Sequence, residues 1–186
     1  MIFRIREQWM PSVLLACLLA GGSAAHSQTA PSAPPTADLS ALAECKFADG
    51  KFVRIKYLSP AMHGRKIFGE LVKYDAVWSP GSGSPPMYQS DALVEVDGNS
   101  VPGGVYSLLL LPSAGEWKLI VSKQIGEDGT AYDAKQDLVR TNLRKSAIPA
   151  AMEQFTISLE VNSANTCRLN FEWELLRLSV KVEETQ

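Results

Sequence analysis

Apolar and polar residues alternate along most of this chain, and only a β-strand places every second side chain on one face. The clearest run is 155–161, where Phe155, Ile157 and Leu159 are separated by polar residues. Turn-forming Asp-Gly and Pro-Gly pairs punctuate the chain. The pattern predicts an all-β fold, an antiparallel β-sandwich or partly open barrel of about nine to ten strands. Further alternating runs lie at 53–57, 92–96, 117–121 and 169–175.

Three departures from the alternation refine this prediction. At Leu175–Leu176 the apolar set moves by one residue, so we expect a bulge, a bend or a strand that passes between sheets. Residues 105–111 are apolar on both faces, which predicts a central, covered strand. Only 38–44 and 132–137 have a helical pattern, each sufficient for a turn or two.

The N-terminal residues have the three parts of a secretory signal peptide: a basic start, the apolar run 13–20 and the small residues 21–25. The run is shorter than the roughly 20 residues that span a membrane, so we expect no membrane span in the mature chain. Cleavage is expected after Ala25 or after Ser27. One alternative is a lipoprotein whose Cys17 is lipidated and retained. Another is a buried helix, although no later segment is helical enough to pack on it.

These features predict a periplasmic or secreted protein with three parts. Residues 1–25 form the signal peptide, 26–40 a Pro/Ala-rich disordered linker, and 41–186 a single β-sandwich domain. Cleavage leaves two cysteines, Cys45 and Cys167. In an oxidising compartment we expect them to form a disulfide that joins the first strand to the last. The alternative is two separately buried thiols.

The composition and motifs exclude several activities. The chain has 18 Lys and Arg against 20 Asp and Glu, which argues against nucleic-acid binding. His63 is the only histidine beyond the cleavage region, so we predict no catalytic triad, no metal site and no cofactor. Glu172 and Glu174 alternate with core residues, which places both on a solvent face. The pair at 127–128 lies in a polar turn, and neither pair predicts acid–base catalysis.

Two residues are candidates for ligand binding on their own chemistry. Arg65 lies in a basic loop with His63, which is either a solvated turn or a site for an anion or carboxylate. Trp78 precedes a Gly/Pro-rich loop at 79–86 and is the best candidate for an exposed ligand platform. We predict that this loop is mobile and non-catalytic, because it contains no charged group. The alternative is a loop that exposes Trp78, Met87 and Tyr88 as an apolar platform.

Residues 57–78 read YLSPAMHGRKIFGELVKYDAVW and closely resemble the signature of a bacterial exported family, domain of unknown function 2911. Matching segments at 101–108, 116–121, 132–138 and 153–157 extend the resemblance over about residues 43–183, and they add Tyr132 to the ligand-binding candidates. The resemblance implies no established activity. Relatives typically continue after the tryptophan with Arg-x-Gly-Ala-Asn-Glu-Ala-Thr, whereas this chain has Ser-Pro-Gly-Ser-Gly-Ser-Pro-Pro at 79–86.

The sequence thus favours a non-enzymatic binding or structural module of the cell envelope. Its partner would be a small molecule, a glycan or a protein, and the candidate ligand-binding residues are Arg65, Trp78, Tyr88 and Tyr132. The alternative is a hydrolase-type enzyme acting on a cell-envelope or extracellular polymer. An enzyme needs a pocket with converging ionisable groups, whereas a binding module needs only an aromatic-lined groove.

Overall fold

A computed structural model of the chain describes residues 38–81, 83–126 and 131–185. The predicted signal peptide, Cys17, both cleavage sites and nearly all of the predicted linker lie outside these residues, as does the carboxylate pair at 127–128. No helix in the described part of the chain is long and apolar enough to cross a membrane.

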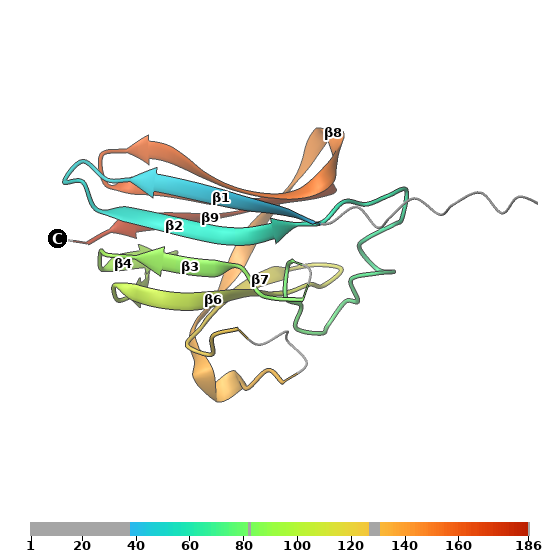
Figure 1. Cartoon of the computed structure of the whole chain (residues 1–186), viewed down its shortest axis with the longest axis horizontal. Helices are drawn as coiled ribbons and strands as arrows, with labels where there is room; N and C mark the ends of the chain where they lie inside the picture. The colour runs from blue at the N-terminus through green and yellow to red at the C-terminus, as the bar shows by residue number, and fades with distance from the viewer. Residues whose placement is uncertain (1–37, 82, 127–130, 186) are drawn as a thin grey trace, which may run out of the picture. The chain divides into compact units, whose positions relative to one another are not determined.

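Nine antiparallel strands form one sheet with the order β1-β2-β3-β6-β7-β8-β9-β4-β5 (Figure 1). The sheet is not closed into a barrel. The predicted all-β antiparallel fold of nine to ten strands is therefore confirmed. The strands are β1 (Leu39–Lys46), β2 (Phe52–Ser59), β3 (Met87–Ser90), β4 (Val94–Val96), β5 (Asn99–Val101), β6 (Gly104–Leu111), β7 (Trp117–Ser122), β8 (Asp137–Ser163) and β9 (Thr166–Glu184).

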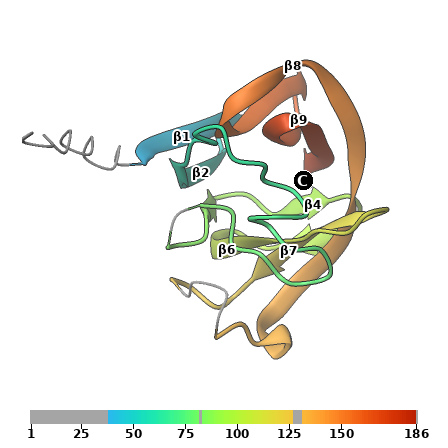
Figure 2. The ribbon, with the colours of Figure 1, turned by 90° about the vertical axis from the view of Figure 1, so that its right-hand side faces the viewer.

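The sheet folds into two layers, and the long strand β8 runs from one layer to the other. Residues 137–143 pair with β7, whereas the part that begins at Arg144 pairs with β9. In Figure 2, β8 rises from the layer that holds β6 and β7 and arches over β9. Two hydrogen bonds connect the end of β2 to β8. The Ser59 hydroxyl donates to the Phe155 carbonyl at 2.7 Å, and the Phe155 amide donates to the carbonyl of Pro60, directly after β2, at 2.9 Å. The two layers thus enclose one core.

The alternation in the sequence selects the residues that fill this core. In β2, Val53 and Ile55 are buried, whereas the intervening Arg54 is partly exposed. In β8, Phe155 and Ile157 point inward in the same way. Because the side-chain period of a strand is two, each strand gives one face to the core. Burial of this apolar face is the main stabilising contribution to the fold.

The predicted bend at Leu175–Leu176 is confirmed. Glu174 has a positive φ of 51°, and Leu175 is 56% exposed between the partly buried Glu174 and Leu176. The register of β8 and β9 also shifts here, because Ala147 faces Leu176 but Met152 faces Glu174. The extra residues in β8 bend the hairpin, as a β-bulge does.

The predicted central strand is β6, the fourth of nine in the sheet order. Leu108, Leu109 and Leu110 are all buried, so consecutive residues are covered on both faces. Val105, at the start of the strand, is 44% exposed. The prediction is therefore confirmed for the second half of the run.

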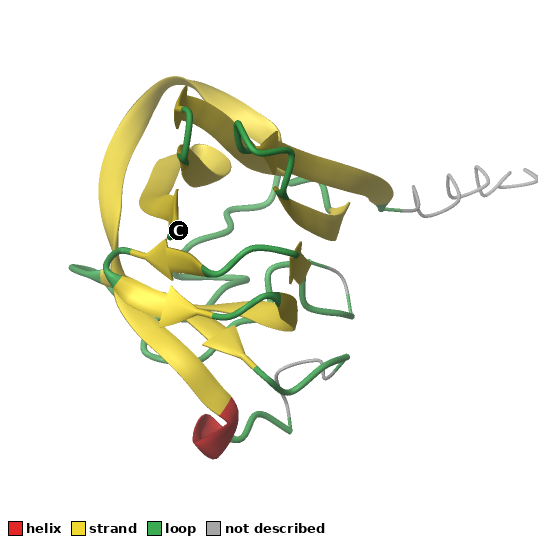
Figure 3. Ribbon diagram, turned by 90° about the vertical axis from the view of Figure 1, so that its left-hand side faces the viewer, coloured by secondary structure: helices red, strands yellow, loops and turns green. Residues whose placement is uncertain are grey.

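The two predicted helical segments have different outcomes. Residues 132–137 contain the short 3₁₀ helix η1 (Ala134–Gln136), which Asp133 caps by accepting a bond from the Lys135 amide (Figure 3). The helix predicted over 38–44 is wrong, because Leu39–Lys46 forms strand β1 and pairs with β2 along its whole length. A continuous ladder satisfies more backbone groups than one or two isolated helical turns, which are unstable in water. The strand begins two residues before the predicted domain start.

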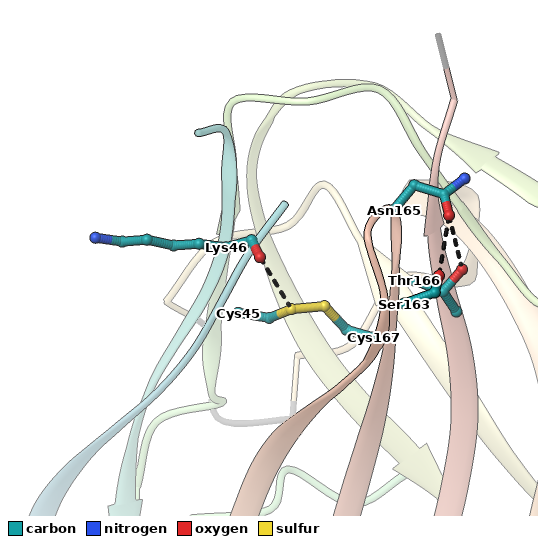
Figure 4. Close-up of a disulfide and its surroundings, with 6 residues drawn as sticks. All are labelled: Cys45, Lys46, Ser163, Asn165, Thr166 and Cys167. Atoms are coloured by element: carbon teal, nitrogen blue, oxygen red, sulfur yellow. Dashed lines mark hydrogen bonds between the residues drawn. A yellow bond between two sulfur atoms is a disulfide. The ribbon is translucent and has the colours of Figure 1, made fainter. Parts of the chain in front are cut away.

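A disulfide joins Cys45 of β1 to Cys167 of β9, as expected from the two cysteines (Figure 4). Both residues are buried, their Cα atoms are 6.6 Å apart, and 122 positions separate them in sequence. The bond lies next to the turn between β8 and β9. There the Asn165 side-chain oxygen accepts bonds from the hydroxyls of Ser163 and Thr166 at 3.1 and 3.3 Å (Figure 4). The cross-link therefore connects the first strand to the last where the hairpin is tightly turned.

Candidate functional site

The long connection between β2 and β3, residues 60–86, is tied to strands at several points. The Met62 amide donates to the Glu153 carbonyl of β8 at 2.9 Å. Trp78 exchanges two backbone bonds with Leu110 of β6, at 2.7 and 2.9 Å. These contacts fix the segment that carries both Arg65 and Trp78.

Trp78 lies on a cluster of aromatic side chains. Its ring stacks on that of Trp173, with centroids 6.1 Å apart and an angle of 13° between the planes. Phe155 and Phe68 meet the Trp78 ring edge-on at 5.8 and 6.3 Å. Trp173 is 3% exposed and donates from its indole nitrogen to the Glu153 carbonyl at 3.1 Å. Trp78 is half-buried, so its ring belongs to both the core and the surface.

Arg65, Trp78 and Trp173 line a hollow of about 360 Å³, together with Asp38 and Gly81. We call it the aromatic pocket. Its volume falls in the usual range of small-molecule sites, about 300–1,000 Å³. The structure thus brings together two of the four predicted binding residues and adds Trp173, which the alternation assigns to the core.

The guanidinium of Arg65 is held in place by its own loop. Its Nε and one terminal nitrogen donate to the carbonyls of Met62 and Ala61, each at 2.9 Å. A guanidinium has five N–H donors, so donors remain for a ligand. An indole face beside a fixed donor suits a ring with one apolar face and polar edges.

A protein-family model described as "Protein of unknown function (DUF2911)" matches residues 40–182. The chain belongs to this family. No curated protein and no solved structure matches it. The match extends from β1 into β9 and includes Arg65, Trp78 and Trp173, so the family domain contains these pocket residues.

The Gly/Pro-rich loop at 79–86 borders the aromatic pocket. Gly81 and Gly83 both line it. Neither residue has a side chain, so these two positions add no polar group to the rim. The ends of the segment are not free, because Ser79, Pro80, Pro85 and Pro86 are buried. The predicted mobile loop is thus anchored on both sides.

Tyr88 does not reach the pocket of this DUF2911 domain. It is 1% exposed and packs against Tyr106, with ring centroids 6.2 Å apart. Its buried hydroxyl has no hydrogen-bond partner among the described residues, and burial raises the pKa of the phenol. The alternative platform of Trp78, Met87 and Tyr88 does not form, because Met87 and Tyr88 point to opposite faces of β3.

Tyr132 also lies away from the pocket, beside η1. Its hydroxyl donates to Asp137 Oδ2 at 2.5 Å and accepts a bond from Arg140 at 2.5 Å. Burial, followed by the Asp137 carboxylate, raises the pKa of Tyr132. This network fixes the start of β8, so Tyr132 has a structural role here.

The carboxylates Glu172 and Glu174 have separate structural partners. Glu172 is buried and forms an ion pair with Arg177 at 2.5 Å, so its predicted place on a solvent face is wrong. Glu174 accepts a bond from the Ile67 amide at the bend. No group of three or more His, Cys, Asp or Glu able to hold a metal occurs among the described residues.

Proposed function

We propose that this chain is an exported, non-enzymatic binding module of the cell envelope, and that the aromatic pocket holds its ligand. The observation that carries the proposal is the partly buried Trp78, whose ring stacks on that of buried Trp173 in a pocket that the fixed guanidinium of Arg65 also lines. Such a surface is rigid before the ligand arrives. A preorganised site loses less conformational entropy on binding.

The ligand class that fits is a glycan or a small cyclic molecule. A sugar ring has an apolar face, which would lie on the indole, and hydroxyl groups at its edge, which would accept bonds from Arg65. Asp38, at the rim, would accept bonds from other hydroxyls. The pocket has one cation and one carboxylate in its lining, so neutral ligands are favoured over strongly charged ones.

The same lining supports a binding role over hydrolysis. General acid–base catalysis requires a group whose pKa lies near the working pH and a second group placed to assist it. The lining contains one carboxylate and no histidine. An aromatic stack with one donor and one acceptor is what recognition requires.

Binding is tested with a panel of soluble neutral oligosaccharides, measured by calorimetry and by the fluorescence of the tryptophans. We expect at least one sugar to bind and to alter the fluorescence, because Trp78 is in the pocket wall. Arg65→Gln should weaken this binding about tenfold. Lys66→Gln is the matched control, because Lys66 is exposed, forms an ion pair with Glu70 and does not line the pocket. Equal effects of the two variants would contradict the assignment.

Export is tested by the intact mass of the protein recovered from a cell-envelope fraction. We expect a chain that starts at His26 or Gln28, because small residues precede both positions. A diacylated chain that starts at Cys17 would instead identify a lipoprotein. A full-length chain in the cytoplasm would contradict export.

A further inference from the structure

The bent hairpin of β8 and β9 folds its polar face onto itself. Asn170, in the first half of β9, is fully buried. Its amide nitrogen donates to the Ser158 hydroxyl at 3.2 Å, and its oxygen accepts a bond from Ser179, beyond the bend, at 2.8 Å. Glu172 and Arg177 form an ion pair across the same bend. Polar side chains that would face solvent in a straight strand therefore face each other.

A cleft of about 600 Å³ opens beside these contacts. We call it the polar cleft. Its lining comes from both halves of the hairpin and from the turn after β4, and it contains no aromatic side chain. The lining includes the charged and amide side chains of Asp97, Arg144, Asn162, Arg168, Arg177 and Lys181.

Two of the four cations in this lining are free to bind a ligand. Arg177 is paired with Glu172, and Lys181 with Glu183. Arg144 and Arg168 form neither an ion pair nor a side-chain hydrogen bond with any residue that the structure describes.

The two free guanidinium groups come from different strands. Arg144 lies in β8 and faces Ser179 in the register, whereas Arg168 lies near the start of β9 and faces Glu160. No ion pair forms between Arg168 and Glu160 within the described chain. Two unpaired guanidinium groups in the lining of one concave surface concentrate positive potential there, although the chain as a whole has a net charge of −2.

We infer that the polar cleft binds a small polyhydroxylated anion, of the class of sugar phosphates and sugar acids, through Arg144 and Arg168. A guanidinium fork matches the oxygens of a phosphate or carboxylate and binds them in a bidentate manner. The hydroxyls of such a ligand suit the amide of Asn162 and the carboxylate of Asp97, which Thr141 holds at 2.9 Å. The cleft volume accommodates a small molecule.

This site is independent of the aromatic pocket. The two linings share no residue. The aromatic pocket supplies an apolar ring surface and suits neutral ligands, whereas the polar cleft supplies charge and hydrogen bonds. Loss of binding at one site therefore leaves the other testable.

The test titrates the intact processed protein with glucose 6-phosphate, glucuronate and glucose by calorimetry at low ionic strength. We expect one or both anions to bind and glucose to leave the cleft empty. Binding should weaken as salt is added, because mobile ions screen the guanidinium charges. Preference for the phosphate or for the carboxylate identifies the anionic group. Failure of both anions to bind, or anion binding that Arg144→Gln and Arg168→Gln leave unchanged, would overturn the inference.

Three variants locate the binding. Arg144→Gln and Arg168→Gln should each weaken binding of the anion about tenfold or more while the thermal midpoint stays unchanged, since both side chains are exposed. Lys145→Gln is the matched control: it removes the same charge from the next position of β8, outside the cleft lining. If Lys145→Gln weakens binding as much as Arg144→Gln, the effect is one of general charge and the cleft is not the site.

Discussion

The aromatic pocket and the polar cleft are both concave, but different kinds of side chain line them. The pocket is lined by Trp173, which is also a core residue, and by Trp78 stacked upon it. The cleft is lined by exposed side chains such as Arg144 and Arg168 on the outer face of a hairpin. In the pocket, the same side chains stabilise the fold and form the surface that we propose binds a ligand. In the cleft, the exposed charged side chains lie on a hairpin whose stability does not depend on them.

This difference should determine how each region tolerates substitution. A core aromatic contributes buried apolar area and contacts with several rings. An exposed charge contributes little to stability, because water solvates it well in both the folded and unfolded states. Evolution could therefore alter the specificity of the cleft with little effect on stability, whereas changes in the pocket wall are constrained by the core.

The largest expected effect is that of Trp173→Ala. Removal of a buried tryptophan leaves a cavity and typically costs about 3–5 kcal/mol of unfolding free energy. It also removes the bond to the Glu153 carbonyl. Arg168→Gln, in the cleft, should change stability by less than about 0.5 kcal/mol. Denaturant titration of both variants measures the contrast. Similar losses for the two would show that the proposed division between the regions is wrong.

Removal of the disulfide should have the next largest effect. The double variant Cys45→Ala/Cys167→Ala should lose about 2–5 kcal/mol, because the cross-link closes a long loop and restricts the unfolded chain. Since Cys167 opens β9, amides at 168–171 should exchange hydrogen faster, while those at 108–110 in β6 change less. Hydrogen exchange by mass spectrometry measures this order. Faster exchange in β6 than in β9 would mean that the bond supports the core more than the hairpin.

The sequence predicted these regions to different extents, for a physical reason. Alternation identifies which side chains share a strand face, so the core residues of β2, β7 and β8 follow from it. The slip at Leu175 likewise predicted the bend. It did not predict that Asn170 and Ser179 would meet across that bend, because a period of two defines a face but not what the face contacts. The cleft depends on that contact and so has no sequence signature.

The pocket was predicted in part because its parts are local. Arg65 and Trp78 lie in the same connection between β2 and β3, and their residue types suggest ligand binding even when the fold is not known. Trp173 joins them from β9, almost one hundred positions later, through tertiary packing alone. Tyr88 lies outside the pocket, and the sequence does not show this because a four-residue strand carries too little alternation to tell which of Met87 and Tyr88 points inward.

Tyr88→Phe tests whether Tyr88 belongs to the core or to a binding site, and its expected effect on stability is intermediate. The buried hydroxyl has no hydrogen-bond partner in the part of the chain that the structure describes, so its removal should stabilise the fold by about 1 kcal/mol at neutral pH. Burial raises the pKa of Tyr88 in the folded state. The unfolded chain therefore ionises first, near pH 10, and the wild-type stability falls above that pH.

In Tyr88→Phe the alkaline loss should be smaller, although Tyr57 and Tyr132, whose pKa values are also raised, retain part of it. Thermal melts at several pH values up to about 11 measure both effects. Sugar binding in the aromatic pocket should stay at the wild-type level. A loss of sugar binding without a gain in stability would show that Tyr88 belongs to the ligand site.

Gly83→Asn tests the rim of the pocket with the smallest expected change in stability. Gly83 has a φ of 80°, and an added Cβ would meet no atom within 4 Å. Asn adopts positive φ more readily than other non-glycine residues, so the cost should stay below about 1 kcal/mol. Gly81→Ala is the contrasting variant: its Cβ would lie 2.8 Å from the Ser84 carbonyl oxygen at a φ of 134°, so it should lose more.

The added amide of Gly83→Asn places a polar group on the rim of the aromatic pocket. It should strengthen sugar binding in the aromatic pocket, because Asn offers both a donor and an acceptor to hydroxyls. Binding of glucose 6-phosphate in the polar cleft should not change, since Gly83 lines only the pocket. Calorimetry with both ligands measures the two outcomes together. If the variant alters anion binding and leaves sugar binding unchanged, the two concave regions are coupled and their independence is wrong.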